Sequence, residues 1–101
     1  MSSSTIEILE ARAKSVRLSE DSLTVDLMDG RTITVPLVWF PRLWHATTEE
    51  RNRFEMFGNG EYIHWPAVDE DVTVAGLLSG RRSGEGAKSL KRWLDSRGQK
   101  A

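Results

Sequence analysis

The stretch from Ser22 to Pro36, SLTVDLMDGRTITVP, is typical of an antiparallel β-hairpin and decides the fold class. Apolar and polar residues alternate on both sides of its Asp-Gly step. A two-residue loop at that step would put the two apolar sets on opposite faces. The three-residue loop Met28–Gly30 pairs Val25 with Ile33 and keeps one face apolar. We therefore predict the longer loop, with Gly30 in the left-handed conformation.

The segments on either side of the hairpin predict short strands and helices. Strands are expected at 15–18 and 61–65. We expect a helical turn from Pro41, a helix from Thr47 to Phe57 with Thr47 and Glu50 as a capping box, and a helix at 87–97. The segment from Val72 is either a strand or a short helix capped by Thr73. This order predicts an α+β fold: a small antiparallel sheet of three to four strands, one or two helices on one face, and a C-terminal amphipathic helix.

Length and composition set the limits of the molecule. The chain has 101 residues, which predicts an N-terminal tail (1–10), a single domain (11–80), a linker (81–86), and a C-terminal helix and tail (87–101). The net charge of -1 argues against strong sequence-independent binding to nucleic acid. The chain has no cysteine, which fits a reducing cytoplasm, and no apolar run long enough for a membrane span.

Four pieces of the sequence occur in a family-specific order: SLTVDLMDGRTITVPL, WFPRL, ATTEERNRFE and GNGEYIHWPAVDEDVTVAGLLSG. Together they resemble the bacterial domain of unknown function 2442 family, from Arg17 to Gly80. Two departures are Tyr62, where the family commonly has glycine, and Phe54, where it commonly has tryptophan. The resemblance implies a small α+β domain. It also implies a gene beside that of a second small protein, in a layout like that of a toxin–antitoxin pair.

The run Asp69-Glu70-Asp71 and the nearby His64 are the residues in this stretch that suit chemistry. Adjacent acids on an extended chain point to alternating faces and lack the spacing of a calcium loop, so we expect no metal or cofactor. The acids suit the N-terminus of the following segment or a charged partner contact. His64 with Asp69 would make a His–carboxylate base, which keeps a small enzyme as the second alternative.

The aromatic residues and the C-terminal segment are the other candidates for function. The large aromatics can serve the core or an exposed patch; they are Trp39, Phe40, Trp44 and Trp65. The final helix places Leu90, Trp93 and Leu94 on one face, which must dock on its own domain, on a second copy or on another protein. Its basic residues make a nucleic-acid-binding regulator the first alternative; the candidates are Arg81, Arg82, Lys88, Lys91 and Arg92.

The sequence favours a non-enzymatic protein-interaction module of the bacterial cytoplasm, the antitoxin-like or regulatory member of a gene pair. We expect a protein partner or self-association, and no membrane contact. The partner-binding candidates are His64, Trp65, Asp69, Glu70, Asp71, Leu90, Trp93 and Leu94.

Overall fold

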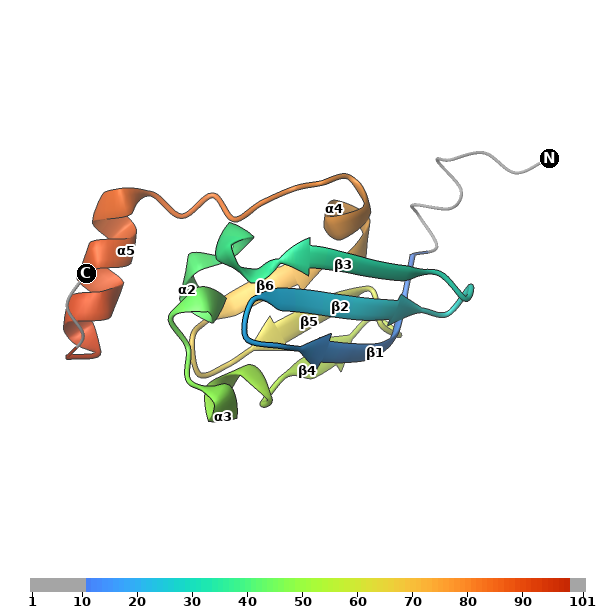
Figure 1. Ribbon diagram of the computed structural model, residues 1–101, viewed down its shortest axis with the longest axis horizontal. Helices are drawn as coiled ribbons and strands as arrows, with labels where there is room; N and C mark the ends of the chain where they lie inside the picture. The colour runs from blue at the N-terminus through green and yellow to red at the C-terminus, as the bar shows by residue number, and fades with distance from the viewer. Residues whose placement is uncertain (1–10, 99–101) are drawn as a thin grey trace.

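The computed structural model describes residues 11–98 and shows an α+β fold (Figure 1). The tail predicted for residues 1–10 lies outside the described residues, as do residues 99–101. Six strands form two antiparallel three-stranded sheets, ordered β1-β2-β3 and β4-β5-β6. The sequence predicted one sheet of three or four strands. The additional strands come from segments for which a helix was predicted or left open as an alternative.

The first sheet contains the predicted hairpin. Its strands are β1 (Ala13–Leu18), β2 (Ser22–Leu27) and β3 (Thr32–Pro36). Val25 lies opposite Ile33 and Leu23 opposite Val35, so the register inferred from the three-residue loop is confirmed. Gly30 has a φ of 96°, which glycine adopts without steric cost.

The second sheet holds the largest difference from the sequence prediction. Its strands are β4 (Glu55–Phe57), β5 (Tyr62–Trp65) and β6 (Glu70–Thr73). The helix predicted to reach Phe57 ends at Arg51, as α3 (Thr48–Arg51), although its capping box is present. The helix prediction for 52–57 was wrong because antiparallel pairing with β5 takes residues 55–57. Strand pairing of this kind overrides a weak local helix preference.

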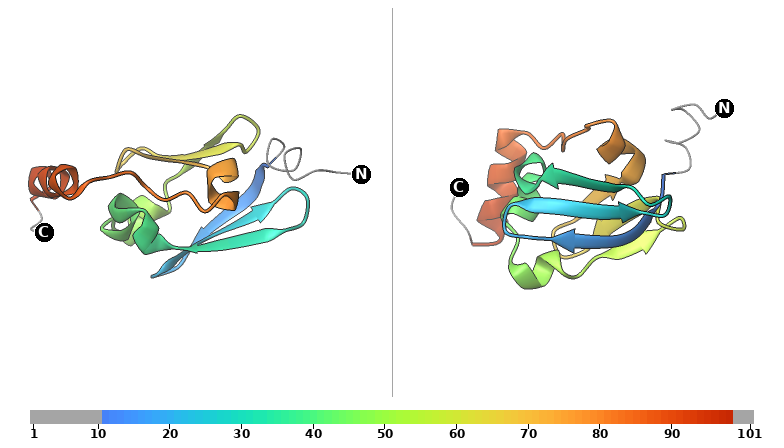
Figure 2. Two further views of the ribbon diagram at one scale, coloured as in Figure 1. Left: turned by 90° about the horizontal axis from the view of Figure 1, so that it is seen from above. Right: turned by 45° about the vertical axis from the view of Figure 1, so that its right-hand side comes forward.

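The two sheets enclose the core between their inner faces (Figure 2). Leu23, Val25 and Leu27 face inward from β2, while Ile63 and Trp65 face inward from β5. Trp65 has no exposed surface, and its indole Nε1 donates to the Arg51 carbonyl at 3.0 Å. A buried indole of this kind is a core residue.

Short helices lie at the ends of the two packed sheets. They are η1 (Leu37–Trp39), α2 (Pro41–Trp44), α3, α4 (Val74–Leu78) and α5 (Ala87–Ser96). The strand and the short helix that were alternatives for the segment from Val72 both occur, one after the other. Strand β6 ends at Thr73, and the Thr73 side chain caps α4 by accepting a hydrogen bond from the Gly76 amide at 3.0 Å. Helix α5 lies at the end of the molecule beside α2 (Figures 1 and 2). No helix within residues 11–98 is long and apolar enough to cross a membrane.

Candidate interaction surfaces

The run of three acids divides between a turn, which holds Asp69, and the two faces of β6, to which Glu70 and Asp71 alternate. Asp69 is exposed in the turn before β6, with a φ of 51°. Glu70 is half-buried on the inner side of β6, and Asp71 is exposed on its outer side. The following helix is capped by Thr73, so capping of α4 does not fall to these acids.

Asp71 is the carboxylate that binds His64. The Nδ1 atom of His64 lies 2.6 Å from Oδ1 of Asp71, because the two residues are cross-strand partners on the outer face of the second sheet. The carboxylate on this imidazole is thus that of Asp71 and not that of Asp69, which is exposed in the turn before β6. Neither His64 nor Asp69 lines the cavity beside β6 that is described below, and no group of three side chains that could hold a metal ion occurs in the described part of the chain.

Two aromatic rings flank this pair on the same outer face. Phe57 and Tyr62 are cross-strand partners, each 47% exposed. The Phe57 ring lies 6.3 Å from the His64 ring, centroid to centroid. We call the set Phe57, Tyr62, His64 and Asp71 the outer aromatic face. Neither aromatic residue was predicted as a contact residue, although Tyr62 and His64 alternate with the apolar residues Ile63 and Trp65 along β5.

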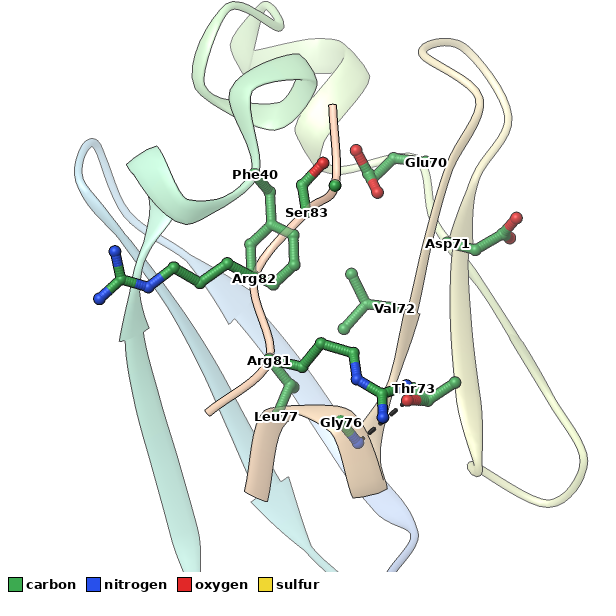
Figure 3. A pocket seen from close by; sticks show the side chains of 11 residues that line it. Phe40, Glu70, Asp71, Val72, Thr73, Gly76, Leu77, Arg81, Arg82 and Ser83 are labelled. Carbon is green, nitrogen blue, oxygen red and sulfur yellow. Dashed lines mark hydrogen bonds between the residues drawn. The ribbon is translucent and has the colours of Figure 1, made fainter. Parts of the chain in front are cut away.

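A cavity of about 240 Å³ lies on the other side of β6, between this strand and residues 81–84 (Figure 3). We call residues 81–84 the strap. The cavity is lined by Glu70 and Asp71, which were predicted to bind a protein partner, and by Arg81 and Arg82, which were predicted to bind nucleic acid. Its floor is apolar and is formed by Phe40, Val72 and Leu77.

Glu70 is the chemically unusual group in this cavity. Burial raises the pKa of its carboxyl to about 7, and the carboxylates of Glu85 and Asp71 act in the same direction, while Arg42 opposes them. The Glu70 side chain faces the strap in Figure 3, and Arg81 extends across the cavity toward Thr73.

The C-terminal helix docks on its own domain. Leu94 is 1% exposed, and Leu90 and Trp93 are half-buried, so the apolar stripe of α5 is covered in cis. The guanidinium carbons of Arg42 and Arg97 lie 5.1 and 4.6 Å from the centroid of the Trp93 ring. Trp65 and Leu94, which were predicted to bind a partner, are therefore buried within this chain and are not exposed for such a contact.

Two ion pairs hold the two ends of this C-terminal segment. Arg42 Nε donates to Glu85 at 2.6 Å, and Arg97 donates to both carboxylate oxygens of Glu50 at 2.7 and 3.0 Å. Arg42 lowers the pKa of Glu85, and Arg97 lowers that of Glu50 to about 2. The basic candidates remain exposed: Arg81, Arg82, Lys88, Lys91 and Arg92.

Residues 13–83 match the family described as protein of unknown function (DUF2442). The match spans more than half of the chain, so this protein belongs to that family, and the resemblance inferred from the sequence is confirmed. The matched region ends before α5 begins.

Two solved structures are similar to this chain. One is a protein of unknown function from Rhodospirillum rubrum, 28% identical, with a TM-score of 0.65, covering 75% of this chain and 94% of that one. The other is the solution NMR structure of an uncharacterized protein from Chromobacterium violaceum, 23% identical, with a TM-score of 0.64, covering 92% of this chain and 82% of that one. The second likeness concerns the fold alone. The comparison with curated proteins gave no significant match.

Proposed function

We propose that this protein is a non-enzymatic protein-interaction module of the bacterial cytoplasm and that the outer aromatic face is its contact surface. The observation that carries the proposal is a contrast between the outer faces of the two sheets. One is a polar surface whose groups bond to one another, and the other presents two large rings.

The outer face of the first sheet is typical of a surface that stays in water. Asp26 accepts hydrogen bonds from Ser15 at 2.6 Å and from Thr32 and Arg17 at 2.9 Å. Beside it, the Thr24 and Thr34 hydroxyls bond to each other at 3.1 Å. On the outer face of the second sheet, Phe57 and Tyr62 are large exposed side chains. Aromatic residues beside polar groups characterise the centres of protein contacts.

The chemistry of the outer aromatic face suits a basic partner surface. His64 has Glu55 as its cross-strand partner on β4 and Asp71 as its partner on β6, so carboxylates flank the imidazole beside the two aromatic rings. Aromatic faces and carboxylates both attract guanidinium and ammonium groups. The partner is therefore a protein whose contact surface carries Arg or Lys, and a single contact surface for one such protein suits the antitoxin-like or regulatory member of a gene pair.

The experiment is a quantitative pull-down from the native host with the full chain as bait. The test variant is Phe57→Ser with Tyr62→Ser, and the matched control is Thr24→Ala with Thr34→Ala on the outer face of the other sheet. We expect the control to recover the same partner as the wild type and the test variant to recover at least about tenfold less. Equal recovery by both variants contradicts the proposal. Light scattering of the purified chain shows whether that partner is a second copy.

A nucleic-acid-binding regulator is the second candidate, favoured by the exposure of five basic side chains in and after the strap. Arg82 also lies with its guanidinium carbon 4.5 Å from the centroid of the half-buried Trp39 ring. Retention on duplex DNA that weakens steeply with salt would support this function, because phosphate contacts release counterions. If the protein-interaction proposal holds, DNA does not retain the chain even at low salt.

A further inference from the structure

Strand β6 is an edge strand, and its hydrogen-bonding register determines which backbone groups face outward. The Val74 amide donates to the Glu61 carbonyl at 3.0 Å, next to the ladder in which Thr73 is opposite Tyr62. Hydrogen-bonded pairs alternate along an antiparallel ladder, so Val72 and Glu70 also bond to β5. Asp71 occupies the alternate position and turns its N–H and C=O away from β5, toward the cavity.

No other segment that the structure describes pairs with this edge. The strap runs alongside β6 (Figure 3), but its backbone amides bond elsewhere: Arg81 donates to the Gly76 carbonyl at 2.8 Å and Ser83 to the Trp39 carbonyl at 3.0 Å. Within residues 11–98, β6 pairs with β5 on one side, and the cavity of about 240 Å³ adjoins its other side. An edge strand in this state is a template for a further strand.

The lining of the cavity defines which strand would fit. Phe40, Val72 and Leu77 provide an apolar floor for one inward side chain. The half-buried carboxyl of Glu70 faces the strap. Of the cations around the cavity, Arg42 is bonded to Glu85, Arg81 extends toward Thr73, and Arg82 lies over the Trp39 ring. A half-buried carboxylate is stabilised by a cation brought to it. The occupant therefore carries a Lys or Arg side chain at an inward position.

We propose that an extended segment of a partner protein, with a basic inward residue, adds to β6 in the space between this strand and the strap. The backbone N–H and C=O of Asp71 bond to the added strand, and Glu70 binds its basic side chain. Strand addition of this kind obtains affinity from main-chain bonds and specificity from alternate side chains. This site uses the backbone of Asp71, whereas the outer aromatic face uses the Asp71 side chain, which binds His64.

The test separates the backbone of Asp71 from its side chain. Random peptides displayed on phage are selected on the full wild-type chain, and the enriched peptide is synthesised. Asp71→Ala removes the carboxylate but keeps the N–H, whereas Asp71→Pro removes both and is tolerated at a free edge. We expect the peptide to bind Asp71→Ala within about threefold of the wild type and Asp71→Pro at least about tenfold more weakly, since one backbone hydrogen bond is worth about that factor.

A second measurement does not depend on the folding of the proline variant. Amide hydrogen exchange of the wild-type chain, followed by NMR, is compared with and without saturating peptide. The Asp71 amide should exchange at least about tenfold more slowly in the complex.

Three outcomes overturn the inference. They are the absence of any enriched peptide, equal binding to both Asp71 variants, and an unchanged exchange rate at Asp71. A peptide that binds Asp71→Pro normally but loses affinity for Phe57→Ser with Tyr62→Ser occupies the outer aromatic face. That result supports the proposed function and contradicts the β6 site.

Discussion

The Glu50 carboxylate accepts two hydrogen bonds from the Arg97 guanidinium, at 2.7 and 3.0 Å, across 47 positions of sequence. The same carboxylate accepts from the Thr47 amide at 2.9 Å and completes the capping box of α3. One side chain thus begins a helix within the family domain and anchors a helix that lies beyond it. Local capping and long-range docking therefore depend on the same group.

Glu50→Ala should destabilise the protein by about 2 kcal/mol, since it removes one of the two side chains of the capping box and one partner of a partly buried ion pair. The matched control is Glu49→Ala in the same helical turn, where the carboxylate makes an exposed pair with Arg53. That control should cost less than about 0.5 kcal/mol. Urea unfolding of both variants measures the difference. Equal losses would show that Glu50 does not anchor α5.

The Glu50 contribution should depend on pH in a definite direction. Arg97 lowers the pKa of Glu50 from 4.5 to about 2, so the ionised carboxylate stabilises the folded state. The stability advantage of the wild type over Glu50→Gln should be constant above pH 4.5 and decline as the pH falls toward 2. Thermal unfolding at several pH values checks this course. An advantage that grows on acidification would contradict it.

Glu70 should show the opposite dependence, because burial raises its pKa from 4.5 to about 7. Its protonated form is favoured in the folded state, so its contribution to stability is complete below pH 4.5 and is lost as the pH rises through 7. Relative to the wild type, Glu70→Gln should therefore gain stability with rising pH, by on the order of 2 kcal/mol between pH 4 and pH 8. Urea unfolding at these two pH values measures the gain, and a parallel shift of both proteins would count against it.

Gly60 and Gly80 provide a matched test of close packing. Both have positive φ, but a Cβ at Gly60 would lie 2.4 Å from the Ala13 carbonyl oxygen, whereas a Cβ at Gly80 meets nothing within 4 Å. Gly80→Ala should cost about 1 kcal/mol from backbone strain alone. Gly60→Ala should cost at least about 2 kcal/mol more, because the clash is with backbone that joins the two sheets. The midpoints of urea unfolding compare the two; similar losses would argue against a tight contact there.

The parts of the fold that could be predicted are those determined by local chemistry. The hairpin register follows from side-chain parity, and Gly30 follows from loop length. Short sequence patterns likewise predict the Thr47–Glu50 capping box and the helix from Ala87. Each of these features depends on residues close together in the chain.

The parts that could not be predicted depend on strand pairing and chain packing that the local sequence pattern does not specify. Phe57 was expected on a helix, and its strand exists because β5 pairs with it. The His64–Asp71 contact follows from the register of β5 with β6, which is set by a turn containing Asp69 at positive φ. The cavity depends on where residues 81–84 return to the domain, which no local pattern specifies.

The dissociation constant between the partner recovered from the host and this chain tests the central claim most directly. It is measured for the wild type, for Phe57→Ser with Tyr62→Ser, and for Thr24→Ala with Thr34→Ala. If the outer aromatic face is the contact surface, Phe57→Ser with Tyr62→Ser raises the Kd at least about tenfold, and Thr24→Ala with Thr34→Ala leaves it unchanged. A Kd that is the same for all three proteins would contradict the assignment of the outer aromatic face.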